Sequence, residues 1–457
     1  MFSTHSARVG AAAVALLGFS VSGASAESLK SALTAAYAHN PAITSALMSV
    51  KIASENIALQ KSATRPILGA STSITDTFGV SGGIGANVQS AQAGLGYSQT
   101  LFDNHKTDAN VEAARAQVAV ANQNLRSAES TVLLNAVQAY MNVILNTQLV
   151  KLRTDSVTFY QSQVKASQDR QNIGEGTKID VAQAQASLAS GVALQKAAMA
   201  ALQSAQASYV QWVGHKPANL SSDFNYGTLI PPSVDRAIAL SNAYNPSILA
   251  AKAAIRAAAA GLDAANASFG PSVGLTGSLG PSFSSVSTTG GKGDSMQLGG
   301  SVKLSLSVPI YSGGALGAAS RQANNNSIKS QLDAQSALLS VNDQVVTAWS
   351  ALQNAAAQIQ SANAAVQAGQ LALQGVIQER DVGQKTTLDV LNQEATLQTS
   401  QEALVSSNAS KVIAAFTLIA ATGRMSPADL HLATATKSAE HYTSKVEDTW
   451  EEVRSFK

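Results

Sequence analysis

The apolar positions of the chain follow a seven-residue period over two very long stretches. In the first stretch they are Val111, Val118, Leu125, Val132 and Ala139. The second stretch repeats the period with Leu338, Val345, Leu352, Ile359, Val366 and Leu373. A sustained period of seven is typical of helices that pack along their whole length, as in a coiled coil. We therefore expect two long helices, one in each half of the chain.

The first of these helices is predicted to be unusually long. No proline or glycine interrupts the chain from Lys106 to Asn172. A helix of this length would extend about 100 Å at 1.5 Å per residue, which an ordinary globular domain does not need. Alanines at a second seven-residue position, Ala114, Ala121 and Ala128, would let neighbouring helices approach closely. A wall of such helices, each with neighbours on both sides, fits this pattern.

Two other stretches alternate between apolar and small polar residues. Val302, Leu304, Leu306 and Val308 are separated by Lys303, Ser305 and Ser307. This period of two predicts strands with one apolar face. We expect one strand hairpin at about 67–101 and a second at about 272–310, with strands of about ten residues, the length that spans a membrane.

The chain contains two copies of one structural unit. Gly174 and Gly383 lie 209 residues apart (383 − 174), whereas Pro41 and Pro246, in two Asn-Pro pairs, lie 205 apart (246 − 41). The offset changes only across the strand hairpin, where a loop tolerates insertion. We assign residues 27–230 to the first repeat and 231–430 to the second, and residues 431–457 to a polar C-terminal tail without a counterpart.

Each long helix is predicted to end in a tight tip, at about 173–181 and about 382–390. The tips share a Gly-x-x-Thr-x-x-Asp pattern, which comprises Gly174, Thr177 and Asp180 in the first and Gly383, Thr386 and Asp389 in the second. Glycine accepts the left-handed conformation that ends a helix. Thr and Asp three residues apart form a capping box that starts the next one. Each tip therefore joins two antiparallel helices.

The N-terminal residues are typical of a secretory signal peptide. A weakly basic start precedes an apolar run from Gly10 to Val21 and a small-residue cleavage site at Ala24 to Ala26. We assign residues 1–26 to the signal and expect the mature chain to begin at Glu27. No later stretch has the roughly 18 consecutive apolar residues of a membrane helix, since the best one, Val412 to Ala421, is too short.

Composition narrows the function further. A net charge of +2 gives no indication of a nucleic-acid partner, and the absence of cysteine excludes disulfides, Cys metal sites and a lipid anchor on cysteine. The histidines have no ligand spacing, so no metal or other cofactor is expected. The segment Gly270 to Gly274 matches a nucleophile elbow but opens a strand after a helix, the reverse of the required order. No catalytic residue is therefore predicted, and we expect a protein that is not an enzyme.

Four strands per chain cannot close a barrel, because small closed barrels need about eight. Aromatic residues lie near the ends of the predicted strands, namely Phe78, Phe102, Phe269, Phe283 and Tyr311. This distribution is typical of the aromatic girdles at membrane interfaces. The strands favour a barrel shared between chains and embedded in membrane lipid, with a small soluble sheet as the alternative.

The duplicated layout resembles the TolC family of outer membrane efflux proteins. The resemblance covers roughly Ser28 to Leu430. The residues that carry it are Asn40-Pro41, Asn245-Pro246, the corners Leu101-Phe102-Asp103 and Pro309-Ile310-Tyr311-Ser312-Gly313-Gly314, and the two Gly-x-x-Thr-x-x-Asp-Val tips. Each motif is short, and their order and spacing in duplicate make the match specific.

The resemblance implies a mainly α fold with a β-barrel portion. Duplicated long-helix hairpins would form an α-helical barrel that crosses the periplasm, and four strands per chain would complete a 12-stranded outer-membrane barrel in a homotrimer. It implies passive conduction of drugs or secreted proteins, received from a periplasmic adaptor and an inner-membrane pump or ABC-type transporter. An exported periplasmic coiled-coil structural protein without channel activity is the alternative.

The resemblance also implies roles for residues of the two tips. Gly174, Thr177, Gly383 and Thr386 would contact the adaptor, although capping alone also explains them. Spacings of four and three place Lys385, Asp389 and Asn392 on one helix face, which the resemblance puts at the periplasmic aperture. Three copies of Asp389 would form an acidic ring there, with Asp180 adding charge nearby. The other interpretation is that Asp389 serves only as a cap.

Overall fold

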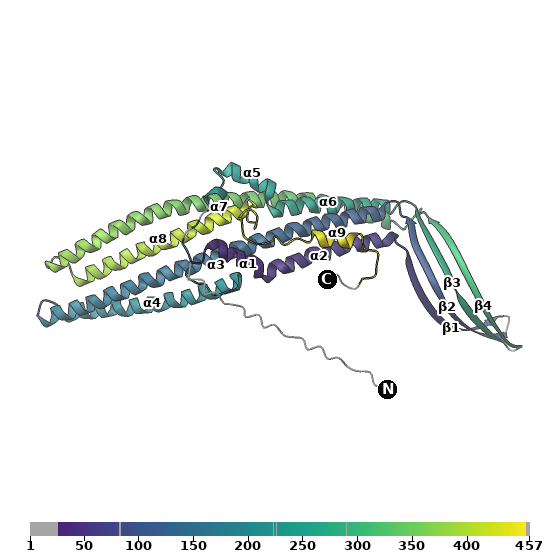
Figure 1. The fold of residues 1–457 in the computed structure, drawn as a ribbon, viewed down its shortest axis with the longest axis horizontal. Coiled ribbons are helices and arrows are strands. Elements are labelled where there is room, and N and C mark those ends of the chain that lie inside the picture. Colours follow the sequence, from purple (N-terminus) through teal and green to yellow (C-terminus); the bar gives the residue numbers. More distant parts are fainter. Residues whose placement is uncertain (1–25, 82–83, 223, 225, 289, 454–457) are drawn as a thin grey trace, which may run out of the picture.

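The chain forms a long bundle of helices that continues at one end into a single layer of strands (Figure 1). The computed structural model describes residues 26–81, 84–222, 224, 226–288 and 290–453. The predicted signal peptide, except Ala26, therefore lies outside the described residues. The helical tips lie at the end of the bundle opposite the strands (Figure 1).

The two halves of the chain have the same order of elements. The first half contains α1 (Leu29–His39), α2 (Pro41–Lys61), η1 (Ser62–Thr64), β1 (Ile67–Ser81), β2 (Ile84–Phe102), α3 (Lys106–Asn172) and α4 (Lys178–Val213). After η2 (Gly227–Leu229), the second contains α5 (Val234–Tyr244), α6 (Pro246–Ala267), β3 (Ser272–Thr288), β4 (Gly291–Ser307), α7 (Ala315–Asp381) and α8 (Thr387–Ala421). The long helix predicted from Lys106 to Asn172 is confirmed at both ends.

The Asn-Pro pairs break the first two helices of each half in the same way. Asn40 ends α1 and caps α2, because its side-chain oxygen accepts the Ala42 N–H at 2.9 Å. Asn245 does the same between α5 and α6. The Asn245 amide also donates to the Ala421 carbonyl oxygen at 2.9 Å, so it ties this break to the end of α8. Proline at the first helical position has no N–H to leave unpaired.

The strands form one antiparallel sheet in the order β1-β2-β3-β4. Ile67 pairs with Ser98 in the first hairpin, and Ser272 pairs with Ser307 in the second. These pairs are related by the offsets of 205 (272 − 67) and 209 (307 − 98), so the hairpins have the same register. The extra four residues therefore lie at the distal end of the second hairpin.

The strands are longer than the sequence pattern indicates. They contain 15, 19, 17 and 17 residues, against the predicted ten or so. The reason is that the antiparallel ladder continues through Ser, Thr and Gly segments in which apolar alternation fades. In these segments backbone pairing, rather than side-chain burial, defines the strand.

The heptad positions of α3 are buried in the main core. Val118, Leu125 and Val132 are all buried, and they pack with residues of α1, α2, α4 and α8. In α7 the apolar heptad positions Val345 and Leu352 are buried, and so are the small positions Ala348, Ala355, Ala362 and Gly369. Close approach of helices at small residues is thus realised most clearly in the second repeat.

α8 meets the length and composition criteria for a membrane-crossing helix. Its best window has a mean hydropathy of 1.5, and 39% of that window is buried inside the chain. As the sequence indicated, α8 has no run of 18 consecutive apolar residues; it reaches this mean because alanine has a positive hydropathy and the window holds at most two charged residues. α8 packs against α7 and α3, which is consistent with a role in the bundle.

The C-terminal tail packs against the first repeat. Leu432, Ala439 and Val446 lie seven residues apart and are all buried. The short helix α9 (Glu440–Glu447) runs beside α2 (Figure 1). The tail is polar overall, as expected, but the seven-residue spacing of its few apolar residues is what attaches it.

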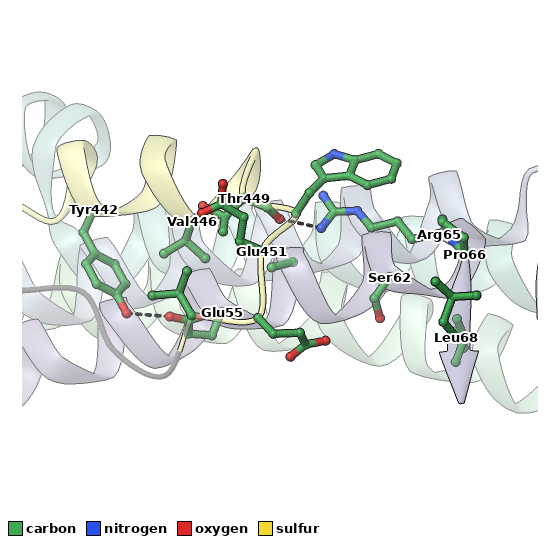
Figure 2. Close-up of a pocket in the computed structure, with 14 residues that line it drawn as sticks. Glu55, Ser62, Arg65, Pro66, Leu68, Tyr442, Val446, Thr449 and Glu451 are labelled. Atoms are coloured by element: carbon green, nitrogen blue, oxygen red, sulfur yellow. Dashed lines mark hydrogen bonds between the residues drawn. The ribbon is translucent and has the colours of Figure 1, made fainter. Parts of the chain in front are cut away.

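Polar contacts fix the tail at both ends. The Lys437 N–H donates to the Tyr37 hydroxyl at 2.8 Å, and that hydroxyl donates to the buried Glu129 carboxylate at 2.7 Å. Burial raises the pKa of Glu129 above the ordinary carboxyl range. Figure 2 shows the other end, where Tyr442 donates to Glu55 and Arg65 donates to the Thr449 carbonyl oxygen, both at 2.5 Å.

Candidate functional site: the helical tips and the strand layer

The turn at each tip depends on a glycine in the left-handed conformation. Gly174 has φ +84 and Gly383 has φ +80, and a Cβ at either position would have open space around it. The glycines are therefore required by backbone conformation and not by crowding. After Gly383, the Gln384 N–H donates to the Glu379 carbonyl oxygen at 2.8 Å, which closes the end of α7.

The predicted capping boxes are confirmed in both tips. Thr177 caps α4 with Asp180 as its partner, and Thr386 caps α8 with Asp389. The Thr386 N–H donates to the Asp389 carboxylate at 2.9 Å, and the Asp389 N–H donates to the Thr386 hydroxyl at 3.2 Å. The two tips thus use the same local chemistry.

Both tip aspartates are held in the charged form. The Thr177 hydroxyl and N–H donate to Asp180 and lower its pKa. The Thr386 N–H and hydroxyl do the same to the pKa of Asp389, assisted by the charge of Lys385. Hydrogen bonds to a carboxylate favour its ionised form. Asp180 and Asp389 are therefore both ionised at neutral pH.

The prediction that one helix face carries Lys385, Asp389 and Asn392 is wrong for Lys385. α8 begins at Thr387, so Lys385 precedes the capping residue and lies in the turn. Helical spacing applies only from the first helical residue onwards. Asp389 and Asn392 remain three residues apart on α8 and share a face, and Asn392 is exposed. Among the described residues, the hydrogen bonds of Asp180 and of Asp389 stay within their own tips.

An ionic contact joins the two hairpins just before their tips, and no pattern in the sequence indicated it. Arg170 of α3 contacts Asp381 of α7 at 2.7 Å. Arg380 contacts the same carboxylate at 2.8 Å and donates to the Gln163 side chain at 2.6 Å. Hydrogen bonds from Arg380 and Arg170 lower the pKa of Asp381. Asn172 occupies the position of Asp381 in the first repeat, so the duplicated pattern did not reveal the pair.

The sheet has one apolar and one polar face. Directly paired residues of antiparallel strands lie on the same face, so the pairing assigns every residue to one side. Leu68, Ile74, Leu95, Leu275, Leu279, Phe283, Met296, Leu298, Val302, Leu304 and Leu306 share the apolar face. Several of them are largely exposed, including Val302 at 82%. Serine, threonine, glycine and glutamine dominate the other face.

The sheet is also incomplete at its edges. In the described residues β1 pairs only with β2, and β4 pairs only with β3. Long unpaired edges next to an exposed apolar face are a liability for a soluble protein. In a membrane barrel the apolar face meets lipid and the edges pair with further strands.

The described residues contain no group of three or more His, Asp and Glu side chains that could hold a metal ion.

These features define a class: an outer membrane channel with a helical tunnel. The model of the family described as outer membrane efflux protein matches residues 32–215 and 237–424. The chain belongs to this family. As expected from the sequence, it is of the TolC type, and it functions in the outer membrane as an efflux or secretion channel whose helical part extends into the periplasm.

Individual relatives cover almost the whole chain. The outer membrane efflux protein BepC of Brucella suis is 36% identical and spans 96% of this chain and 95% of its own length. TolC of Escherichia coli is 27% identical over 91% of this chain and 87% of its own. The crystal structure of the Campylobacter jejuni CmeC outer membrane channel aligns with a TM-score of 0.75 at 17% identity, over 92% and 89% of the two chains. The alternative of a coiled-coil structural protein is not favoured.

Proposed function

We propose that three copies of this chain form one passive conduit from the periplasm to the cell exterior. The observation that carries this proposal is the four-stranded layer with one apolar face and two unpaired edges. Three layers joined edge to edge would give a closed 12-stranded barrel and remove every edge. The purified protein in planar lipid bilayers should show discrete channel currents. Their absence from a preparation shown to be oligomeric would contradict the proposal.

The periplasmic end of the conduit narrows at Asp389, where three carboxylates meet around the axis, with Asn392 on the same helix face. The lowered pKa of Asp389 keeps this ring charged, and converging carboxylates attract cations. Lys385 and Asp180 modulate the charge from the turn and from the other tip. Asp389→Asn removes the charge but keeps a side chain able to cap α8.

The aperture is tested by ion selectivity. The Asp389→Asn channel should lose its cation preference and its block by multivalent cations added on the periplasmic side. Asp180→Asn, at the equivalent position of the other tip, is the matched variant and should cause a smaller loss. Unchanged selectivity in a folded Asp389→Asn trimer would leave Asp389 as a helix cap only.

The two tips form the contact surface for a periplasmic adaptor, which links the channel to an inner-membrane pump or an ABC-type transporter. Gly174, Thr177, Gly383 and Thr386 shape that surface. The exposed positions of all four at the end of the bundle support this assignment. Cross-linking from the tips in intact cells, followed by identification of the captured chains, would name the adaptor and transporter.

A backbone change at one tip tests the contact. Gly383→Val places a β-branched residue at φ +80, which disfavours the turn. Export should be abolished while trimers still assemble. Gly375→Ala is the matched control, because Gly375 lies inside α7 with open space around it. Normal export by the Gly383→Val variant would contradict the contact role.

Export begins with removal of residues 1–26. Glu27 supports this boundary, because it is held firmly: its N–H donates to the Asn219 carbonyl oxygen and its carboxylate accepts the Tyr209 hydroxyl at 2.8 Å. N-terminal sequencing of the purified channel should start at Glu27. A chain that retains its first residues in the assembled channel would contradict it.

A further inference from the structure

The polar face of the strand layer contains one charged residue among the residues that the structure describes. That residue is Lys303 of β4. The remainder of this face is uncharged, and includes Ile67, Gly69, Ser71, Ser73, Thr75, Thr77 and Gly79 of β1, Ala86, Val88, Ser90, Gln92, Gly94, Gly96, Ser98 and Thr100 of β2, Ser272, Gly274, Thr276, Ser278, Gly280, Ser282, Ser284 and Val286 of β3, and Gly293, Ser295, Gln297, Gly299, Ser301, Ser305 and Ser307 of β4. Lys303 therefore gives this otherwise neutral face a single positive charge per chain.

The side of the sheet on which Lys303 lies follows from its neighbours. Val302 and Leu304, which flank it, are 82% and 67% exposed on the apolar face. Side chains alternate along a strand, so Lys303 projects from the opposite face. Its partner on β3 is Thr276, which pairs in turn with Ser98 of β2. In a barrel with its apolar face towards lipid, this row faces the water-filled lumen.

No carboxylate of the described residues compensates Lys303. The charged residues of the apolar face, Asp76, Asp294 and Lys292, lie nearer the distal ends of the strands. There Asp76 accepts a hydrogen bond from Gln89, and Lys292 lies 3.9 Å from Asp294. Lys303 itself is exposed and forms no ion pair with any part of the chain that the structure describes.

A neighbouring copy would not compensate it either. Closing the barrel brings β1 of the next copy beside β4, and the face-to-face alternation must be kept, because a one-residue slip would turn the apolar side inward. Lys303 then faces one of the neutral residues of β1. The pairing of Ser98 with Thr276 makes this specific. Adding 209 to Ser98 gives Ser307 of β4, and subtracting 205 from Thr276 gives Ser71 of β1, so Ser307 would pair with Ser71 of the next copy. In an antiparallel pair, Lys303, four residues before Ser307, then lies opposite Thr75, four residues after Ser71.

We propose that three Lys303 side chains form a cationic ring in the lumen of the strand barrel, which binds and concentrates anions on their way out. The inference rests on the proposed trimeric channel. Unpaired charges of one sign in a narrow lumen raise the local concentration of oppositely charged solutes. The conduit thus carries opposite charges at its two ends, acidic at the helical tips and basic among the strands. Multivalent anions, such as polyphosphates, are the class of ligand that three convergent ammonium groups fit.

The test uses reconstituted channels and inorganic tripolyphosphate as the probe. Tripolyphosphate added to the compartment into which the strand barrel opens should reduce the wild-type current. The Lys303→Gln channel should lose this block and shift its reversal potential in a KCl gradient towards greater cation preference. Lys292→Gln, which removes a lysine from the other face of the same strand, should leave both properties unchanged.

The lack of cysteine permits a second, matched test by chemical rescue. Lys303→Cys should react with a water-soluble aminoethyl thiosulfonate reagent, which leaves an ammonium group on the side chain and should restore the block. Val302→Cys, one residue away and facing lipid, should not react.

The outcomes separate the two proposals. Wild-type protein that forms no channels would overturn the proposed conduit and the ring with it. Channels that conduct normally but keep the block and the selectivity after Lys303→Gln would overturn the ring alone. Equal labelling of the Val302→Cys and Lys303→Cys variants by the thiosulfonate reagent would also overturn the ring.

Discussion

α3 and α7 occupy equivalent places in the two repeats and have equal lengths of 67 residues, yet their surroundings differ. α3 is enclosed by helices from both halves of its own chain, namely α1, α2, α4, α6 and α8. α7 packs on α5, α6 and α8 and leaves one flank bare. On this flank Leu332, Leu339 and Val346 lie seven residues apart and are 61%, 62% and 45% exposed.

The comparison indicates what covers the bare flank. The neighbours that α3 takes from the second repeat are α6 and α8. The equivalent helices in the first repeat are α2 and α4, so α7 would pack against α2 and α4 of the next copy. An exposed apolar stripe with helical spacing is the expected mark of such an interface. The chain thus forms one of these helix contacts internally, and we expect the equivalent contact to form between copies.

The largest expected effect comes from a charge on the bare stripe of α7. Leu339→Asp should abolish the trimer, because a carboxylate without a partner would be buried between copies. Size-exclusion chromatography with light scattering would measure the assembly. Ser340→Asp, at the next exposed position, is the matched control and should assemble normally. Intact trimers of the Leu339→Asp variant would refute the proposed contact between copies.

The next effect tests how tightly the first hairpin is packed. Gly191 of α4 lies against Tyr160 of α3, and a Cβ there would lie 2.8 Å from the Tyr160 ring. Gly191→Ala should therefore destabilise the hairpin, because overpacking a core costs about 1–3 kcal/mol and the better helix propensity of alanine returns only about 1 kcal/mol. A lower thermal midpoint in circular dichroism would register this. No change would mean that the ring moves aside freely.

A glycine at the contact between α7 and α8, in the second hairpin, should respond in the opposite direction. Gly369 of α7 faces Leu397 of α8, where a Cβ would lie 3.3 Å from the end of a flexible side chain. Gly369→Ala should be neutral or stabilising by up to about 1 kcal/mol, because alanine favours helix over glycine. The same thermal measurement applies. Equal destabilisation by the two substitutions would remove the contrast between the hairpins.

The smallest expected effect concerns the C-terminal tail, whose helix α9 packs against α2 of the first repeat. Arg115 and Lys61 contact Glu447 at 2.5 and 3.0 Å and lower its pKa. Because docking lowers the pKa of Glu447, its ionised form stabilises the docked tail at pH values above the ordinary pKa of glutamate. This contribution is lost as the pH falls through the pKa of Glu447 in the folded protein. Protease sensitivity of the tail should therefore rise below about pH 4.5.

The control for this pH effect is Glu447→Gln. That variant should have a partly released tail already at neutral pH and a weaker response to acid. The expected difference is modest, since ion pairs that solvent reaches contribute about 1 kcal/mol or less. A tail that stays protected at low pH in both proteins would show that the ion pairs of Glu447 do not hold it.

The sequence predicted the features that depend on local chemistry. The ends of α3 and the capping boxes at Thr177 and Thr386 follow from a few adjacent residues, and all were confirmed. Duplication added strength, because each weak motif occurred twice at a fixed offset. The register of the two strand hairpins agrees with the offsets of 205 and 209 residues for the same reason.

The features that depend on distant pairing were not predictable in the same way. Strand length is set by ladder pairing through Ser and Gly, which have little intrinsic strand preference. The contact of Arg170 with Asp381 requires the relative axial position of two hairpins, which no local pattern contains. Lys385 lies off the helix face of Asp389 because α8 is capped at Thr386, one residue after it. The docking of the tail was readable in principle, from three apolar residues seven apart.

Native mass spectrometry of the channel extracted from outer membranes tests the central claim most directly. One chain has a mass of 46.8 kDa before removal of the signal. We predict a single species with three times the mass of the mature chain, which also gives channel currents in a planar bilayer. A stable membrane-inserted monomer that conducts by itself would contradict the claim that three incomplete strand layers close one barrel.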